Sequence, residues 1–373
     1  MIKVLVTFGT RPEAIKLAPV IHALKNRKGF EVVVCVTSQH REMLDQVLSL
    51  FNIQPDIDLN VMKPNQNLMQ LTSEILVALK KVFEEVKPDW LIVQGDTTTT
   101  FAASLAGFYS KIRVAHVEAG LRTDDKYHPY PEEINRRLTG VLTDFHFAAT
   151  EKARENLIRE GVASEKIVVT GNTVIDALLS VVHKVRDGRR KIFQERFSML
   201  DSSKKLILVT GHRRESFGEH FENICNSLYQ IAEQEPDVEI VYPVHLNPNI
   251  RIPAHQILGQ HPRIHLLEPL EYEPFVYLMD QSYIILTDSG GIQEEAPSLG
   301  KPVLVIRNKT ERPEGVEAGA AKVIGRSTQD IVRETRHLLQ NETLYKKMSR
   351  VRNPYGDGTA SDRIALTLES FQA

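Results

Sequence analysis

The sequence predicts an α/β protein of two domains, each built on a parallel β-sheet, and three observations support this prediction. The chain has 373 residues, more than the roughly 250–300 residues that a single hydrophobic core usually holds. Short β-branched runs alternate with segments of helical periodicity, as βαβ units require. These runs are almost wholly apolar, as expected of strands that are buried on both faces.

The expected strands form two series. Six lie in the first half of the chain, at residues 3–9, 31–37, 90–96, 113–120, 145–150 and 166–171, and four in the second half, at residues 205–211, 239–244, 283–290 and 302–306. A polar, basic stretch separates the two series. We therefore place a first domain at residues 1–176, a connecting segment at 177–202 and a second domain at 203–358.

The tail of the chain is predicted to form one amphipathic helix from about residue 359 to 373. Its apolar positions recur at helical spacing. They are Ile364, Leu366, Leu368 and Phe371.

Charge and cysteine content exclude several classes of protein. Lys and Arg total 46 against 48 for Asp and Glu, a net charge of -2, so no basic field attracts nucleic acid or an acidic membrane. Cys35 and Cys225 are too few for a disulfide framework and are expected to be small core residues. The opening MIKVLVTFGT lacks the layout of a signal peptide, and no apolar run approaches ~18 residues. We expect a cytoplasmic protein without a membrane span.

Ligands of open parallel sheets bind beyond the carboxyl ends of the strands, so the residues that follow each strand carry most functional weight. GTRPEAIK follows the first strand, and its Arg11 and Lys16 stand near a helix start that suits an anionic ligand. Neither GxGxxG nor GxxxxGK[ST] occurs there, which argues against a dinucleotide fold and a P-loop. A solvated loop is the alternative for the two cations.

Three carboxylates follow later strands of the first half. Asp96, in QGDTTTT, stands at a helix start, where an ordinary N-cap is the alternative. Glu118, in HVEAGLRT, follows an apolar strand and must be paired or protonated. Glu132 opens a proline-led helix in HPYPEEINRR, four residues before Arg136 on the same face. A surface ion pair is the alternative for these last two residues.

Polar residues also follow the first strand of the second half. GHRRESFG places His212 and Arg213 there, and guanidinium groups match the geometry of phosphate oxygens. A histidine that bonds a backbone carbonyl is the alternative.

The segment TDSGGIQEEAPSLGKPVL is the most distinctive of the chain. Ser289, Gly290 and Gly291 let a helix start approach an anion closely, as is usual for a diphosphate. Glu295, one turn into that helix, is placed to reach ribose hydroxyls. The alternative is a glycine-rich turn whose acidic residues are favoured by the helix dipole.

Signatures of metal and serine-nucleophile sites are absent from the sequence. HExxH does not occur, and the HVE that ends at Glu118 lacks the downstream PCxxC of a zinc deaminase. No GxSxG elbow occurs either. We expect chemistry without a metal, nicotinamide or flavin.

The chain resembles the bacterial non-hydrolysing UDP-N-acetylglucosamine 2-epimerases. The motifs GTRPEAIK, QGDTTTT, HVEAGLRT, PEEINRR, TGHRRE and TDSGGIQEEAPSLGKPVL carry this resemblance, in order along the chain. It implies a GT-B fold, with two Rossmann-like domains whose parallel sheets face a central cleft and a terminal helix that crosses back to the first domain. It also implies reversible conversion of UDP-GlcNAc to UDP-ManNAc for envelope polysaccharides, no cofactor, and a homodimer.

The resemblance further implies the roles of individual residues. The positions expected in catalysis are Asp96, Glu118, Glu132 and His212. Those expected to bind substrate are Arg11, Lys16, Arg136, Arg213, Phe275, Ser289, Gly290, Gly291, Glu295 and Arg312. Some members are activated by a second UDP-GlcNAc, and the residues that resemble that site are Gln39, His40, Gln46, Gln70, Glu133 and His245.

Inversion at C2 of the sugar removes a barely acidic hydrogen, so loss of UDP to give 2-acetamidoglucal is the expected route, as the family is held to work. Two acid/base groups on opposite faces of the sugar are needed, each worth ~10²–10⁴ in rate. Asp96 and Glu118 are expected closest to C2, with Glu132, held by Arg136, as an alternative. Crowded carboxylates should differ in pKa, but the sequence leaves open which one is the base.

Other functions remain open at this point. A GT-B glycosyltransferase would pass the sugar to an acceptor, and a hydrolysing epimerase would release free ManNAc. A non-catalytic UDP-sugar sensor would leave the acidic motifs without a purpose. Those clustered acidic motifs favour the epimerase.

Overall fold

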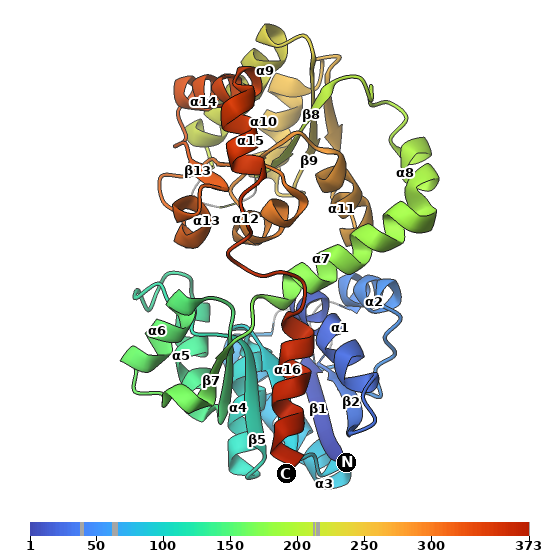
Figure 1. The fold of residues 1–373 in the computed structure, drawn as a ribbon, viewed down its shortest axis with the longest axis vertical. Helices are drawn as coiled ribbons and strands as arrows, with labels where there is room; N and C mark the ends of the chain where they lie inside the picture. Colours follow the sequence, from blue (N-terminus) through green and yellow to red (C-terminus); the bar gives the residue numbers. More distant parts are fainter. Residues whose placement is uncertain (38–40, 62–65, 212, 214–216, 373) are drawn as a thin grey trace. The chain divides into compact units, whose positions relative to one another are not determined.

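The chain folds into two compact units (Figure 1). The computed structural model describes residues 1–37, 41–61, 66–211, 213 and 217–372. The N-terminal unit comprises Met1–Ala177 and Tyr355–Ala373, and the C-terminal unit comprises Leu178–Pro354. Helix α7 (Thr173–Lys184) begins in the first unit and ends in the second.

The N-terminal unit is built on a seven-stranded sheet of order β3-β2-β1-β4-β5-β6-β7, in which all neighbouring strands are parallel. The predicted parallel α/β class is thus confirmed for this unit. Its strands are β1 (Ile2–Phe8), β2 (Phe30–Val36), β3 (Ile57–Asp58), β4 (Trp90–Gln94), β5 (Arg113–Ala119), β6 (Phe145–Ala148) and β7 (Ile167–Val169). Its helices are α1 (Arg11–Lys25), α2 (Arg41–Leu50), α3 (Leu68–Val86), α4 (Thr98–Tyr109), α5 (Glu132–Leu142), α6 (Glu151–Arg159) and α16 (Ala360–Glu369), with a 3₁₀ turn at Ser164–Lys166.

The C-terminal unit holds a six-stranded parallel sheet of order β10-β9-β8-β11-β12-β13. Its strands are β8 (Lys205–Thr210), β9 (Val238–Pro243), β10 (Ile264–Leu267), β11 (Ile284–Thr287), β12 (Val303–Val305) and β13 (Ala321–Val323). Its helices are α8 (Arg190–Arg196), α9 (Glu219–Gln234), α10 (Pro248–Leu258), α11 (Tyr272–Gln281), α12 (Gly290–Glu295), α13 (Pro313–Glu317), α14 (Thr328–Gln340) and α15 (Glu342–Ser349).

Three strands were missing from the sequence prediction. β3, β10 and β13 are only two to four residues long and lie at the edges of their sheets, so they lack the long apolar run of a central strand. The connecting segment predicted at 177–202 is mostly helical. It contains the end of α7, a π-helical turn at Val185–Arg189 and α8.

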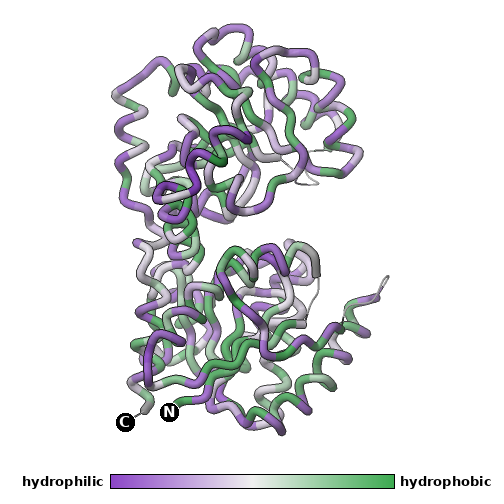
Figure 2. Tube along the Cα trace, turned by 90° about the vertical axis from the view of Figure 1, so that its right-hand side faces the viewer, coloured by the Kyte–Doolittle hydropathy of each residue, from purple (hydrophilic) through white to green (hydrophobic). Residues whose placement is uncertain are grey.

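The central strands form the core of each unit. In Figure 2 the strand-rich middle of the N-terminal unit is mostly coloured as hydrophobic, whereas hydrophilic residues dominate the exposed turns. Cys35 and Cys225 are fully buried, as predicted for small core residues. Within the described part of the chain, no helix has both the length and the apolar character needed to cross a membrane.

Helix α16 packs against α1 within the N-terminal unit. Ile364 and Leu368 are fully buried, whereas Leu366 is 54% exposed, so the apolar positions of the predicted helix do not all lie on its buried face. The ring of Phe371 lies 5.2 Å from that of Trp90, measured between ring centroids. At the other end of the helix, Ser361 donates to Asp176 through its backbone N–H at 2.8 Å and its hydroxyl at 2.6 Å.

We expect Leu368→Ala to destabilise the N-terminal unit by about 2–5 kcal/mol, because a buried leucine is replaced by a cavity. Leu366→Ala, in the same helix, should change stability by no more than about 0.5 kcal/mol. Urea unfolding followed by the fluorescence of Trp90, the single tryptophan of the chain, measures this unit specifically. Equal effects of the two substitutions would contradict the docking of α16.

Candidate active site

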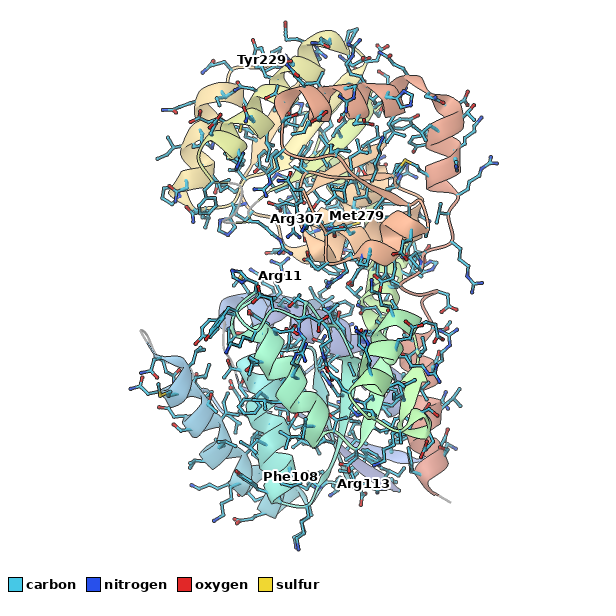
Figure 3. All side chains as sticks on the ribbon, turned by 90° about the vertical axis from the view of Figure 1, so that its left-hand side faces the viewer. Arg11, Phe108, Arg113, Tyr229, Met279 and Arg307 are labelled. Atoms are coloured by element: carbon cyan, nitrogen blue, oxygen red, sulfur yellow. The ribbon has the colours of Figure 1, made fainter. Side chains whose placement is uncertain are left out.

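The site residues of the N-terminal unit gather where its parallel strands end. Figure 3 labels Arg11 at one end of this unit and Arg113 and Phe108 at the other. Arg113 is the first residue of β5 and Phe108 lies near the end of α4. Arg11, the first residue of α1, therefore marks the carboxyl ends of the strands, where parallel sheets bind ligands.

Helix α1 begins with a capping box in which Thr10 and Glu13 bond each other's backbone N–H groups. The Glu13 carboxylate is buried and also accepts hydrogen bonds from the hydroxyls of Thr97, at 2.7 Å, and Thr100, at 3.1 Å. Burial raises the pKa of the Glu13 carboxyl, although donors from Thr10, Thr97 and Gly9 act to lower it. Glu13 thus joins the loop after β1 to the start of α4, a role that the sequence did not reveal.

The N-cap of α4 is Thr97 and not Asp96, so the N-cap alternative for Asp96 was wrong. The Thr97 hydroxyl accepts from the Thr100 N–H at 3.1 Å. Asp96 precedes the cap and pairs instead with Arg136, with 2.6 Å between Oδ2 and Nη2. Its side chain retains 28% exposure, so it remains accessible to a ligand.

Arg136 lies almost completely buried on α5. Besides Asp96 it contacts Glu133, with 3.4 Å between Nη1 and the nearer carboxylate oxygen. Among the described residues no ion pair joins it to Glu132, and Glu132 Oε2 is buried without a hydrogen-bond partner. The surface-pair alternative for Glu132 and Arg136 was therefore wrong, and so was the expectation that Arg136 holds Glu132, because Arg136 is buried and pairs with Asp96 and Glu133 instead.

The three predicted carboxylates influence one another. Burial raises the pKa of Asp96; the Arg136 guanidinium acts to lower this pKa, while the charges of Glu118 and Glu132 act to raise it further. The net direction is upward, so Asp96 holds a proton more readily than an ordinary aspartate. The structure thus brings Asp96, Glu118 and Glu132 into one electrostatic cluster.

Glu118 lies at the end of β5, where the ladder to β6 shifts register between Val117 and Ala119. Its φ of +63° falls in the left-handed region, which costs a residue with a Cβ about 1–3 kcal/mol. Its two carboxylate oxygens lie 2.7 and 2.6 Å from the Lys16 ammonium. The expectation that Glu118 must be paired or protonated is thus met by pairing with Lys16.

The residues predicted to form an activator site lie in different surroundings. Glu133 is fully buried, where its carboxylate accepts from the backbone N–H of Thr123 at 3.0 Å and from Arg137 Nε at 2.9 Å. Gln70 completes the capping box of α3, where its side chain accepts from the backbone N–H of the N-cap residue Asn67 at 3.2 Å. Gln46 and His245 are exposed. Gln39 and His40 lie outside the described residues.

In the C-terminal unit, Arg213 is anchored before any ligand arrives. Its backbone N–H donates to Asp288 Oδ2 at 2.9 Å, and its Nη2 donates to Glu311 Oε1 at 2.5 Å. Burial acts to raise the pKa of Glu311, but the guanidinium groups of Arg213, Arg307 and Arg312 together hold this pKa down at about 2. His212, predicted beside Arg213, lies outside the described residues.

Helix α12 begins where the glycine-rich motif predicts, with Ser289 as its N-cap. A Cβ on Gly290 would lie 3.1 Å from Glu311 Oε1, so only glycine fits here without displacing the acid. Glu295, the last residue of this short helix, accepts from the Tyr272 hydroxyl at 2.8 Å. Arg312 donates to Glu294.

Phe275 is half-buried on α11. In Figure 3 the label of Arg307, which follows β12, lies at the opposite end of this unit from Tyr229 on α9. The strand ends of the second sheet therefore carry the arginines and the start of α12.

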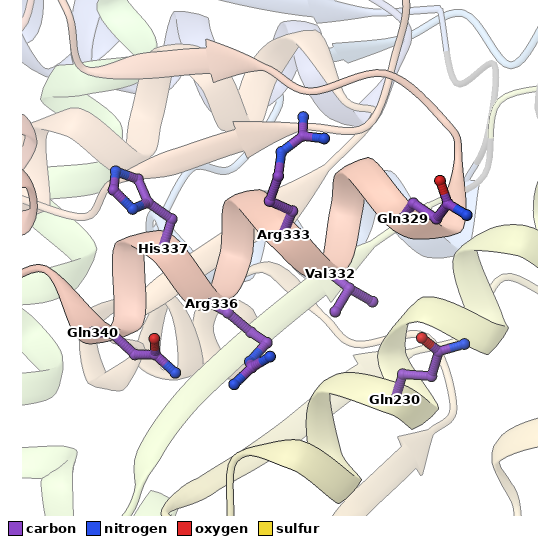
Figure 4. A pocket seen from close by; sticks show the side chains of 7 residues that line it. All are labelled: Gln230, Gln329, Val332, Arg333, Arg336, His337 and Gln340. Atoms are coloured by element: carbon purple, nitrogen blue, oxygen red, sulfur yellow. The ribbon is translucent and has the colours of Figure 1, made fainter.

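A further hollow of about 430 Å³ lies between α14 and Gln230 of α9 (Figure 4). Its arginines are already paired, Arg336 with Glu235 at 2.7 Å and Arg333 with Asp330 at 2.7 Å. None of the predicted site residues lines it. In the described ranges, no group of three or more His, Cys, Asp or Glu side chains is arranged to hold a metal ion.

The sequence and the fold of this chain are both similar to those of known UDP-N-acetylglucosamine 2-epimerases. Residues 22–369 match the family model described as UDP-N-acetylglucosamine 2-epimerase. The chain is similar to the UDP-N-acetylglucosamine 2-epimerase of Yersinia pestis, with 58% identity over 372 residues that cover 99% of each protein. It is also similar to the crystal structure of the Neisseria meningitidis UDP-GlcNAc 2-epimerase bound to UDP-GlcNAc, with a TM-score of 0.93, 54% identity, and coverage of 99% of this chain and 100% of that one.

A more distant structure shares the whole fold. The Methanocaldococcus jannaschii UDP-GlcNAc 2-epimerase in complex with UDP-GlcNAc and UDP matches with a TM-score of 0.82 and 34% identity, over 99% of this chain and 100% of that one. These neighbours are of the GT-B type, which confirms the predicted class of two Rossmann-like units.

We expect Arg136→Gln to raise the pKa of Asp96 further, because the cation that opposes the effect of burial is removed. A ¹³C NMR titration of labelled aspartate carboxyls measures this change. Arg137→Gln is the matched control, since Arg137 pairs with Glu133 and Asp124 and not with Asp96. An unchanged Asp96 titration in Arg136→Gln would show that the ion pair does not govern this carboxyl.

Proposed function

This chain belongs to the UDP-N-acetylglucosamine 2-epimerase family, and we propose that it interconverts UDP-GlcNAc and UDP-ManNAc without hydrolysing them. The observation that carries the proposal is the cluster of Asp96, Glu118 and Glu132 at the strand ends, with cations paired to two of its members. Such a cluster supplies acid and base groups to one substrate. The relatives that match over full length are named UDP-N-acetylglucosamine 2-epimerases, which supports the epimerase part of the proposal.

The nucleotide half of the substrate suits the C-terminal unit. Two related structures hold UDP-GlcNAc, and one of them also holds UDP. In this chain, Gly290 and Gly291 open α12, and free N–H groups at a helix start favour a diphosphate. We propose that this start and Arg213 bind the diphosphate, with Glu295 on the ribose and His212, Phe275 and Arg312 completing the site.

The chemistry follows from the weak acidity of the C2 hydrogen. UDP leaves C1 with the electron pair of the C1–O bond, a carboxylate takes the proton from C2, and the C–H pair becomes the double bond of 2-acetamidoglucal. Protonation of C2 from the other face and return of a β-phosphate oxygen to C1 then give the epimer. Developing positive charge at C1 makes the C2 hydrogen more acidic, so a carboxylate is a sufficient base.

The environments of the carboxylates favour different roles. Glu118 is held by Lys16 on both oxygens, and hydrogen bonds to the charged form keep a carboxylate ionised. Asp96 has a raised pKa, which favours its neutral form. We propose Glu118 as the base and Asp96 as the acid in the forward direction, with their roles exchanged in the reverse; Glu132 is the alternative partner.

Retention of UDP separates this reaction from hydrolysis. A departing diphosphate that stays bound excludes water from C1 and is available for return. A sensor of UDP-sugars would need the binding groups but not an acid with a raised pKa, and so Asp96 favours the enzyme.

We further propose that the product supplies ManNAc units for envelope polysaccharide, as the resemblance implies. Activation by a second UDP-GlcNAc stays a prediction. Of the residues predicted for that site, Gln46 and His245 are exposed.

We also propose that the chain forms a homodimer through α3, α4 and α5, which pack side by side. Large apolar side chains on these helices are exposed, among them Val77, Phe108, Tyr109 and Val141. Exposed large apolar side chains on neighbouring helices support an association surface there. Sedimentation velocity at micromolar concentration should find a dimer, and a monomer throughout would refute this assembly.

Incubation of the purified protein with UDP-GlcNAc alone in deuterated water tests the function and the mechanism together. We expect UDP-ManNAc to appear in the NMR spectrum, with solvent deuterium at C2 of both nucleotide sugars. Asp96→Asn should lower kcat by about 10²–10⁴ with little change in UDP affinity.

Three other outcomes of this incubation would contradict the proposed function or its mechanism. Free ManNAc with UDP would indicate a hydrolysing epimerase, and protium retained at C2 would remove the elimination route. Binding of UDP-GlcNAc without any turnover would favour the sensor.

A further inference from the structure

Two amide side chains complete the hydrogen-bonding shell of Glu118. Asn172 Nδ2 donates to Glu118 Oε1 at 2.8 Å, and Gln94 Nε2 donates to Oε2. Lys16 contacts both oxygens, so each oxygen accepts from the ammonium and from one amide. A protonated carboxyl would direct its own O–H against one of these donors, and this shell therefore favours the ionised form of the resting residue.

The Asn172 amide cannot turn over. Its Oδ1 accepts from the Val174 N–H at 3.1 Å at the start of α7, which fixes the NH₂ group on the side of Glu118. The residue is buried, and its backbone N–H donates to the Tyr355 carbonyl at 2.6 Å. A Cβ on the preceding Gly171 would lie 3.1 Å from Gly356 Cα, so the two segments pass close together and hold Asn172 in place.

The main chain of Gln94, which donates to the other carboxylate oxygen, is anchored as well. It is the last residue of β4 and is buried. Its backbone carbonyl accepts from the Thr100 hydroxyl at 2.6 Å, which ties it to the start of α4. The amide donors thus follow or end two strands, β4 and β7. In the sheet order these two strands lie on either side of the pair β5 and β6, and Glu118 is on β5.

We infer that Gln94 and Asn172 are positioning residues that hold Glu118 ionised and in a fixed orientation, so that it serves as the base. This inference rests on the proposed function. The charged and titratable groups that interact with Glu118 include Lys16, Asp96 and His116, and the charges of Glu132 and Arg136 act on the same Asp96. Neutral amides stabilise the negative charge of Glu118 without adding a second cation beside Lys16. A second cation would lower the basicity of Glu118 further.

The amides also compensate for the backbone of Glu118. Its positive φ is unfavourable for a residue with a Cβ, and such a conformation persists only where the surroundings over-determine it. Donors on both oxygens supply that constraint. The left-handed backbone and the two amides therefore act together to present one carboxylate in one orientation.

Asn172→Asp and Gln94→Glu test the inference, because each removes one donor and adds a carboxylate while keeping the size of the side chain. Asn172→Asp also keeps an oxygen acceptor for the Val174 N–H. We expect kcat at neutral pH to fall by about 10- to 100-fold with KM nearly unchanged, and the acidic limb of the pH–kcat profile to move to higher pH. Asn156→Asp is the matched control, since the Asn156 amide donates to the Gly120 carbonyl at 2.9 Å and not to Glu118.

A ¹³C titration of the labelled Glu118 carboxyl reads the same effect without turnover, and so separates this inference from the proposed function. Its midpoint should move to higher pH in Asn172→Asp and in Gln94→Glu, and stay in place in Asn156→Asp. If one variant does not fold, by circular dichroism, the other tests the opposite oxygen of the same carboxylate. An unmoved midpoint in a folded variant, or a pH–kcat profile equal to that of the control, would overturn the role of the amides.

Discussion

The ion pair between Lys16 and Glu118 is the interaction on which the N-terminal site depends. It joins the first helix of the unit to the end of β5, with the ammonium 2.6 and 2.7 Å from the two carboxylate oxygens. Without this cation, a carboxylate beside Asp96 and Glu132 would be driven to take up a proton. With it, the Lys16 ammonium stabilises the charged form of Glu118 at both oxygens, while the neighbouring Asp96 has a raised pKa. An enzyme that exchanges a proton across a sugar ring needs such an unequal pair.

The second unit also pairs opposite charges, but there one carboxylate lies among several cations. There a carboxylate, Glu311, lies among Arg213, Arg307 and Arg312, and its pKa falls to about 2. The acid holds the guanidinium groups beside Gly290 before a ligand arrives. Arginine side chains that are already ordered lose less conformational freedom when they bind phosphate. In each unit, therefore, charged side chains are held in place by oppositely charged neighbours within the protein, so a ligand would meet groups that are already ordered.

The fold class was predictable from the sequence, and so was the position of most candidate site residues at the strand ends, because both depend on local signals. Long apolar runs identified the central strands, and glycine, proline and charged residues marked the carboxyl ends of those strands. What the sequence concealed depends on tertiary distance. The partner of Arg136 is Asp96, 40 positions away, although Glu132 lies at the favourable helical spacing. Gln94 and Asn172 are ordinary strand-end amides until the sheet brings them to Glu118, and the two-residue β3 exists only because β2 pairs with it. Leu366 has apolar character but faces solvent, since a short helix on a sheet buries only a narrow stripe.

Neutron diffraction from deuterated crystals of the full chain at pD near 6 locates the protons of this cluster themselves. We expect three deuterons on Lys16 Nζ, none on either oxygen of Glu118, and amide deuterons of Gln94 and Asn172 directed at that carboxylate. A deuteron bound to Glu118, or an Asn172 amide turned with its oxygen toward it, would contradict the claim that this residue is held ready as the base.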